Sequence, residues 1–323
     1  MKTLCRTIWL FFFFVSPLTG FAADMLIGEQ KTHVVQKDET LLSVGAQYGV
    51  FWKTIARENG ITADQPLVPG SILKINTRRI VPKLVGNGIV INIPDRSLYF
   101  FKDGQVTFFP VGLGVLTKTN TSDWRTPTGN FYVTSKRKNP TWHVPDSIQL
   151  ENFIKGKSVE ERVPPGPKNP LGKYAIETSI PATLIHETIW PNSVYRYTSH
   201  GCIRMLPKHM EQFYNMVDVK TKGEIIYEPV KLAVLDGGKI YLEVRTDVYG
   251  KYQSLRERII ELAYSRDVSD RVDWQKVDRL IKLEAGVAED VTTSPKTAVN
   301  QPHKESVAEK FLGYLKSRFK DWI

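Results

Sequence analysis

The chain has 323 residues, of which 41% are hydrophobic and 24% charged, a balance typical of a globular protein with room for two domains and tails. Its formal net charge of +10 favours anionic partners such as cell-wall polymers, lipid headgroups or nucleic acid. Nucleic acid is the weakest of these, because no tight run of Lys and Arg with interleaved aromatic residues occurs. The sequence also lacks a CxxC pair and the spacing of a zinc site, so we expect no metal and no cofactor.

The N-terminus has the three parts of a secretory signal peptide. Lys2 and Arg6 make a basic start, residues 8–15 are an unbroken apolar run, and Gly20-Phe21-Ala22 offers small residues for cleavage. The apolar run is too short for a comfortable membrane span, so an uncleaved anchor is the less favoured alternative. We therefore expect residues 1–22 to be removed on export, which takes two positive charges from the chain.

Residues 31–78 have the pattern of a compact unit with the order strand, helix, helix, strand. Thr40 is a typical residue to precede a helix, and a second helix is expected from Trp52 to Asn59. With its Thr40-Leu41 helix entry and its Pro69-Gly70 turn, the unit resembles the LysM module. The resemblance implies that it binds peptidoglycan through glycans that contain N-acetylglucosamine. A small accessory domain of unrelated use is the alternative.

Residues 87–229 change to short strands separated by turn residues. Asp103-Gly104 between two apolar runs is a strong hairpin signal. Strands are expected at 89–93, 98–101, 106–111, 131–135, 174–177, 183–186 and 221–227. This spacing predicts a mainly β domain built as an antiparallel sandwich or barrel.

Residues 139–173 interrupt these strands with a stretch rich in Pro, Gly and charge. A long loop inside a compact domain is usually functional or disordered. Here it would be a flap that covers a bound peptide, with Trp142 and His143 as contacts, or else a solvated loop. The glycine spacing between Gly166 and Lys173 does not match a phosphate-binding loop.

The most informative stretch is Ser199-His200-Gly201-Cys202, which holds the only cysteine outside the predicted signal peptide. A lone thiol cannot form an internal disulfide, and a nearby imidazole, such as that of His186, would activate it as a nucleophile. The stretch is therefore a candidate cysteine acyl-transfer site. The alternative is a buried cysteine that acts as a small hydrophobic residue.

These residues resemble the motif of the YkuD-type L,D-transpeptidase catalytic domain: His186, a gap, then Ser199-His200-Gly201-Cys202, with Arg204 two residues on. Two flanking segments that also resemble this domain are 125–129 and 169–172. Glu187 stands where glycine is frequent in the family, and Arg204 stands where some members have asparagine. The resemblance implies a β-sandwich or barrel with its site at one edge. It also implies an enzyme that cross-links peptidoglycan and is inhibited by carbapenems.

We expect Cys202 to be the nucleophile and His186 to be the general base and acid, either as a neutral acceptor of the thiol proton or in a resting ion pair. Backbone N–H groups near Gly201 would bind the oxyanion. Ser199 and His200 would orient the site by hydrogen bonds. A papain-type fold is disfavoured, because there the cysteine precedes its histidine in the chain.

Two side chains are candidates for binding the substrate. Arg204 would hold a carboxylate bidentately, as guanidinium geometry allows, or would make a structural ion pair. Trp142 would contact the substrate from the predicted flap.

The C-terminal part begins with an extension at 230–286. Its sequence pattern predicts a β-hairpin at 231–234 and 240–244, followed by two helices near 253–265 and 271–284. Residues 287–303 have the composition of a linker. Residues 304–323 would form an amphipathic basic helix, with Phe311, Leu312, Leu315, Phe319 and Trp322 at helical spacing. Such a helix would contact a membrane surface or a partner, or pack on its own protein.

Three functions remain open. The leading one is a peptidoglycan L,D-transpeptidase, in which Cys202 forms an acyl-enzyme with a tetrapeptide stem, releases D-Ala, and passes the acyl group to an amine of another stem or of a wall-anchored lipoprotein. An L,D-carboxypeptidase or amidase would use water instead. A non-catalytic protein would only bind peptidoglycan through residues 31–78. We expect the periplasm of a Gram-negative bacterium as the location, and roles in cell-wall organisation and cell shape.

Overall fold

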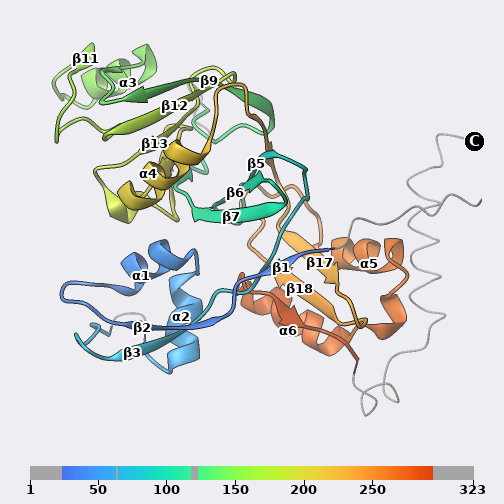
Figure 1. Cartoon of the computed structure of the whole chain (residues 1–323). Coiled ribbons are helices and arrows are strands. Elements are labelled where there is room, and N and C mark those ends of the chain that lie inside the picture. Colours follow the sequence, from blue (N-terminus) through green and yellow to red (C-terminus); the bar gives the residue numbers. More distant parts are fainter. Residues whose placement is uncertain (1–23, 63–64, 118–122, 294–323) are drawn as a thin grey trace, which may run out of the picture.

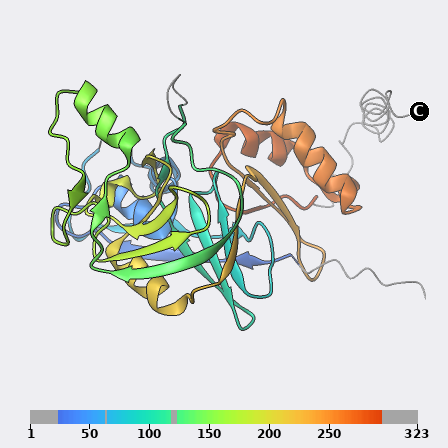
Figure 2. The same cartoon turned by 90° about the horizontal axis from the view of Figure 1, so that it is seen from above.

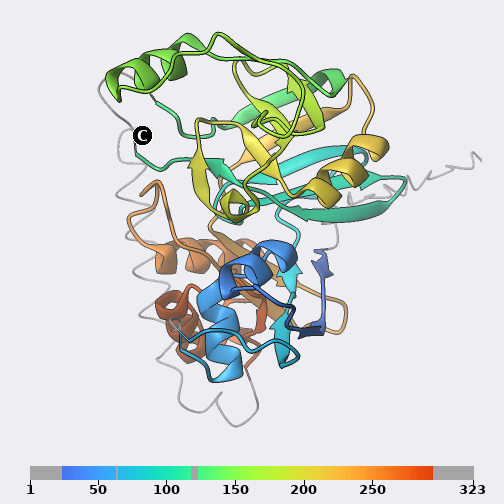
Figure 3. The same cartoon turned by 90° about the vertical axis from the view of Figure 1, so that its left-hand side faces the viewer.

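The computed structural model describes residues 24–62, 65–117 and 123–293, which form three parts (Figure 1). A small N-terminal unit and a C-terminal unit lie below a larger β-rich domain (Figures 1 and 3). The predicted signal peptide, residues 1–22, and the predicted basic helix, residues 304–323, lie outside the described residues. Among the helices that are described, none has the length and apolar composition needed to cross a membrane.

The N-terminal unit has the predicted βααβ order. Its elements are β2 (Gln30–Val34), α1 (Leu41–Tyr48), α2 (Trp52–Asn59) and β3 (Ile72–Asn76). Thr40 accepts a hydrogen bond of 3.1 Å from the amide of Ser43 and so caps α1, which ends at Gly49 with a left-handed φ of 65°. The strands pair antiparallel, with Val34 opposite Ile72. Local capping signals therefore define both ends of α1.

The β-rich domain is built on one sheet of eight strands in the order β15-β13-β12-β9-β16-β5-β6-β7. Their bounds are β5 (Gly88–Asn92), β6 (Ser97–Lys102), β7 (Gln105–Pro110), β9 (Gly129–Lys138), β12 (Tyr174–Thr178), β13 (Leu184–Glu187), β15 (Ile203–Met205) and β16 (Lys222–Ile226). The mainly β fold class is confirmed. However, β13 pairs parallel with β15 and β16 pairs parallel with β5, so the sheet is mixed rather than antiparallel. The segment 188–202 is long enough for the crossover that a parallel pair requires.

The sheet nearly closes on itself. Gly112, just after β7, exchanges two backbone hydrogen bonds of 2.8 Å with Arg204 of β15. A Cβ atom at Gly112 would come within 2.4 Å of the carbonyl oxygen of Ser193, so this approach requires glycine. Helix α4 (Pro207–Met216) packs Phe213 into the core. Shorter elements are β8 (Leu113–Gly114), η1 (Pro191–Ser193) and β14 (Tyr197–Ser199), which pairs with β8.

The segment predicted as a flap or a loop contains regular structure. Its elements are β10 (Trp142–His143), α3 (Asp146–Ile154) and β11 (Arg162–Val163), and β10 pairs with β11. None of the residues of α3 is buried, and Figure 2 shows this helix projecting from the edge of the β-rich domain. Phe153 and Ile154 are 72% and 74% exposed, so α3 depends on few contacts for its position.

The C-terminal unit contains the predicted hairpin and helices. Its elements are β17 (Val230–Val234), β18 (Ile240–Val244), α5 (Leu255–Ser265), η2 (Ser269–Arg271), α6 (Trp274–Leu283) and β19 (Glu289–Asp290). The prediction of a linker from residue 287 is corrected for residues 287–293. There β19 pairs with β18, and Ala288 and Val291, which flank this short strand, are fully buried in two hydrophobic clusters, so these residues belong to the folded unit. Residues 294–303 of that predicted linker lie outside the described residues.

Buried charges join the C-terminal unit to the β-rich domain. The ammonium of Lys231 lies 2.6 Å from Asp95 and 3.0 Å from Glu243. Arg245 lies 2.9 Å from Glu243 and donates a hydrogen bond of 2.5 Å to the hydroxyl of Tyr195. Three of these charged side chains come from β17, β18 and the residue after β18, and all are almost fully buried. The network therefore fixes the two parts against each other.

The N-terminal unit is held by both other parts. Thr54 of α2 donates a buried hydrogen bond of 2.7 Å to the carbonyl of Ala285, beyond α6. Arg79, in β4 (Arg79–Ile80), donates a hydrogen bond of 2.9 Å to the carbonyl of Tyr48. Strand β4 pairs with β1 (Leu26–Ile27). Ala46 of α1 packs in one buried cluster with Val194 and Tyr195 of the β-rich domain, so the N-terminal unit has a fixed position relative to that domain.

Candidate active site

The residues of the motif gather at one edge of the sheet. Strands β13 and β15 run parallel, with His186 opposite Arg204. Side chains alternate between the two faces of a strand, so Leu184 and His186 share a face with Cys202 and Arg204. All four line one cavity with a volume of about 820 Å³. The register of this parallel pair therefore brings the predicted nucleophile and the predicted base to the same space.

Cys202 is partly exposed in this cavity. Its Sγ–H donates a hydrogen bond of 3.6 Å to the carbonyl oxygen of Ala182. Burial raises the pKa of the thiol above its ordinary value, and this effect outweighs the N–H of Leu184 and the charge of Arg204, which both lower the pKa. The group therefore rests as a neutral thiol.

His186 is buried, and its Nδ1 lies 2.6 Å from the carbonyl oxygen of Glu187. Because a carbonyl only accepts hydrogen bonds, Nδ1 carries the proton and Nε2 keeps a free lone pair. Burial lowers the pKa of His186 to about 4, and the positive charge of Arg204 also lowers this pKa. At neutral pH the imidazole is thus an uncharged base. Burial thus favours the neutral form of both side chains, and among the described residues no hydrogen bond joins the imidazole to Cys202.

The turn before the nucleophile is held from both sides. Ser199 is buried, and its hydroxyl donates a hydrogen bond of 2.5 Å to the carbonyl of Cys202. Gly201 has a φ of 103°, which disfavours any residue with a side chain. The hydroxyl of Thr126 donates to the carbonyl of Gly201 at 3.0 Å and accepts from the amide of Gly114 at 2.9 Å. These bonds fix the peptide plane between Gly201 and Cys202.

That peptide plane leaves hydrogen-bond donors available. In a trans peptide the N–H is antiparallel to the preceding C=O, so the amide of Cys202 points away from Thr126. Within the described ranges, neither this amide nor that of Gly201 donates to another protein group. Both are therefore candidates to stabilise an oxyanion.

His200 connects the turn to the flap. Its Nε2 donates a hydrogen bond of 2.8 Å to Glu151 of α3, and its ring packs edge-on against Trp124 with centroids 4.3 Å apart. Sequence reasoning missed both partners, because neither is near His200 in the chain. It also missed Thr126, although this residue lies in the 125–129 segment that resembles the family.

Arg204 lies over the ring of Trp190, with the guanidinium carbon 5.5 Å from the ring centroid. Its Nε is buried and has no hydrogen-bond partner in the part of the chain that the structure describes. Nor does the guanidinium form an ion pair with any residue of the described part. The cavity that Arg204 lines also includes Trp142 and His143 of β10. Among the described residues, no group of three or more His, Cys, Asp and Glu side chains is placed to hold a metal ion.

Comparison with known proteins gives two family matches. Residues 86–230 match the YkuD model, described as the L,D-transpeptidase catalytic domain, and residues 33–76 match the LysM domain. "Probable L,D-transpeptidase YcfS" of Escherichia coli K12 is 32% identical over 246 residues, which are 74% of this chain and 72% of the relative. "Probable L,D-transpeptidase ErfK/SrfK" of the same strain is 30% identical over 261 residues, 78% and 81% of the two chains. The crystal structure of an L,D-transpeptidase from Mycobacterium tuberculosis H37Rv aligns with a TM-score of 0.32 at 16% identity, over 50% of this chain and 74% of that one.

Proposed function

The chain belongs to the L,D-transpeptidase family, with a LysM domain near its N-terminus, and on this premise we propose that it is a cysteine acyltransferase that acts on peptidoglycan. The observation that carries the proposal is the shared cavity of Cys202 and His186, in which the imidazole has a protonated Nδ1 and a free Nε2. A nucleophile beside a base that is itself oriented by a third group is the general arrangement for acyl transfer.

In the first half-reaction, His186 takes the thiol proton as the sulfur of Cys202 attacks the carbonyl carbon of the third residue of a tetrapeptide stem. The free amides of Gly201 and Cys202 receive the developing oxyanion, an interaction worth about 3 kcal/mol per donor in comparable sites. The C–N bond then breaks, and the leaving amine of D-Ala takes the proton from His186. A thioester remains on Cys202.

In the second half-reaction, an acceptor amine attacks the thioester. His186 removes a proton from the attacking nitrogen, the C–S bond breaks, and the sulfur recovers its proton. The acceptor is an amine of another stem or of a wall-anchored lipoprotein. Ser199 and His200 hold the turn during both half-reactions. Ser199 does so through its hydrogen bond to the carbonyl of Cys202, and His200 through its hydrogen bond to Glu151 of α3.

Two residues are proposed to bind the donor peptide. Arg204 lines the cavity, and among the described residues it pairs with no carboxylate, which favours binding of a substrate carboxylate over a structural ion pair. Trp142 lies on the flap hairpin that borders the same cavity and would pack on the stem. Together they would orient the stem so that its scissile carbonyl lies at the sulfur.

The domain arrangement supports work on an extended polymer. We propose that the LysM unit, residues 31–78, binds the glycan while the catalytic domain, residues 87–229, acts on the peptide, in the periplasm of a Gram-negative bacterium after removal of residues 1–22. The product would contribute to cell-wall organisation and cell shape. Contact of residues 304–323 with a membrane surface remains a prediction outside the described residues.

The test is incubation of the purified protein with a tetrapeptide muropeptide, followed by separation of the products. Cross-linked dimers and free D-Ala support the transpeptidase, whereas tripeptide monomers alone would identify the carboxypeptidase. Intact mass after treatment with a carbapenem should show one adduct on the wild type and none on Cys202→Ala. No adduct and no product would leave only the wall-binding function.

A further inference from the structure

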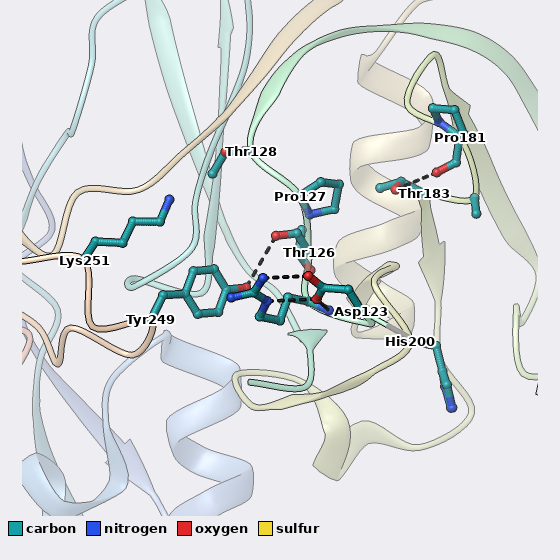
Figure 4. A pocket seen from close by; sticks show the side chains of 11 residues that line it. Asp123, Thr126, Pro127, Thr128, Pro181, Thr183, His200, Tyr249 and Lys251 are labelled. Atoms are coloured by element: carbon teal, nitrogen blue, oxygen red, sulfur yellow. Dashed lines mark hydrogen bonds and ion pairs between the residues drawn. The ribbon is translucent and has the colours of Figure 1, made fainter. Parts of the chain in front are cut away.

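A second cavity, with a volume of about 490 Å³, is lined by residues of the β-rich domain and of the C-terminal unit (Figure 4). Asp123, Ala182 and His200 line both cavities. Because the sulfur of Cys202 lies 3.6 Å from the carbonyl oxygen of Ala182, the nucleophile stands near the boundary between them. A thioester on this sulfur could therefore meet one substrate in each cavity.

We propose that this second cavity is the acyl-acceptor subsite, and that it binds an amine that carries a carboxylate, with Lys251 as the partner of the carboxylate. The proposal rests on the proposed function and adds a place and a chemistry for the second substrate. Tyr249 and Lys251 come from the loop between β18 and α5, outside residues 86–230 that match the catalytic family model. Figure 4 shows both side chains on the side of the cavity opposite His200.

The loop that carries these residues is firmly held. Asp247 accepts hydrogen bonds from the amide of Tyr252 at 2.8 Å and from the hydroxyl of Tyr227 at 2.5 Å. That hydroxyl in turn accepts a hydrogen bond of 2.7 Å from the amide of Tyr249, and the two tyrosine rings stack with centroids 5.1 Å apart. Lys251 therefore stands on a fixed wall of the cavity, which is what recognition of a small group requires.

The charges in the cavity favour an anion. Arg125 and Asp123 form an ion pair of 2.6 Å and largely cancel each other. The ammonium of Lys251 lies 4.6 Å from the ring centroid of Tyr227 and, within the described ranges, is paired with no carboxylate. Burial raises the pKa of Tyr249 to about 12, so its hydroxyl stays uncharged and donates to the carbonyl of Thr126 at 3.4 Å. Lys251 thus leaves one net positive charge facing the cavity.

The chemistry of the reaction selects among anions. The acceptor must bring an unprotonated amine to the thioester carbonyl. A diamino acid whose α-carboxylate is free combines such an amine with an anion, whether it belongs to a second stem or ends a protein chain. Binding the carboxylate at Lys251 would place the amine toward Ala182 and the sulfur.

The experiment separates the two half-reactions in the full-length mature protein. Acyl-enzyme formation from a tetrapeptide muropeptide is followed by intact mass, and transfer is followed with Nα-acetyl-lysine, with Nα-acetyl-lysinamide, which lacks the carboxylate, and with a tripeptide muropeptide. The variants are Lys251→Ala, Lys251→Arg, and Lys239→Ala as the control, because Lys239 is an exposed lysine of the same unit at the β17–β18 turn.

We expect Lys251→Ala to leave acylation within twofold of the wild type and to raise the acceptor KM about tenfold for the carboxylate-bearing amines. The amide analogue should respond little, Lys251→Arg should keep most of the wild-type transfer, and Lys239→Ala should match the wild type. Nα-acetyl-lysine and the tripeptide muropeptide are then compared. The one whose transfer rate falls more in Lys251→Ala is the better mimic of the natural acceptor. Three results would contradict the acceptor subsite but not the proposed function. They are equal losses of transfer to Nα-acetyl-lysine and to its amide, slower acylation in Lys251→Ala, and transfer unchanged by this substitution. A wild-type protein that forms no acyl-enzyme would overturn the proposed function and the subsite with it.

Discussion

Glu151 of the flap accepts a hydrogen bond of 2.8 Å from His200, the residue two positions before the nucleophile. Helix α3, which carries Glu151, has no buried residue, so this bond is one of the few contacts between the helix and the rest of the catalytic domain. Lys155 also contacts Glu151, four residues along the same helix, and this contact lowers the pKa of the carboxyl group. The carboxylate is therefore charged at neutral pH and couples the position of the flap to the geometry of the site.

The first prediction concerns this coupling. Glu151→Ala should speed hydrogen exchange of the amides in α3 and slow acylation by a carbapenem about three- to tenfold, because a charge-assisted hydrogen bond of about 1–2 kcal/mol is lost. Glu160→Ala, an exposed change in the same flap, serves as the control. Unchanged exchange in α3 would show that the helix does not depend on His200.

The second prediction concerns pH. His186 with a pKa of about 4 stays an uncharged base down to mildly acidic conditions, and the raised pKa of Cys202 keeps the thiol protonated up to its ordinary value of 9.0 and beyond. Acylation measured as kcat/KM should therefore be flat from about pH 5 to about pH 9 and fall only as pH drops toward 4, where the base becomes protonated. A resting ion pair would instead make Cys202 react with iodoacetamide rapidly near pH 6, and we expect slow alkylation there.

The local part of the fold could be predicted from the sequence. Thr40 and Gly49 determine the ends of α1 through hydrogen bonds and a backbone angle that involve only nearby residues. The motif alone predicts that His186 and Cys202 lie near each other, and both residues line one cavity. Neither inference needed knowledge of distant contacts.

Long-range features could not be predicted in the same way. The parallel register of β13 and β15 depends on the path of the intervening chain, which periodicity does not encode. Glu151 lies 49 positions from His200 in the sequence, and no local pattern connects the two residues. Lys251 lines the second cavity because buried charges hold the C-terminal unit against the β-rich domain. The sequence indicates only a separate extension there, so it does not predict that this unit contributes a residue to the cavity.

The third prediction concerns Thr126. Its hydroxyl links the amide of Gly114 to the carbonyl of Gly201, and both are buried. Thr126→Val keeps the shape but leaves two polar groups without partners, so we expect a loss of about 2–4 kcal/mol in stability and at least tenfold slower acylation. Thr126→Ser keeps the hydroxyl and should retain most of the stability and most of the acylation rate. Thermal unfolding and carbapenem acylation measure the two effects, and equal behaviour of Val and Ser would contradict the role of the hydroxyl.

The last prediction concerns the buried network between the β-rich domain and the C-terminal unit. Although burial alone would raise it, the pKa of Asp95 is held below its ordinary value by Lys231 and Arg245. Lys231→Met removes one cation and leaves excess buried negative charge, so the free energy of unfolding should fall by about 3–5 kcal/mol in urea titrations. Lys239→Met, at an exposed position, should change it by less than about 0.5 kcal/mol. Adding Asp95→Asn to Lys231→Met should recover part of the loss, because it removes the unpaired charge. The free energy of unfolding of Asp95→Asn alone completes the cycle. If Asp95→Asn destabilises Lys231→Met as much as it destabilises the wild type, the two residues are not coupled.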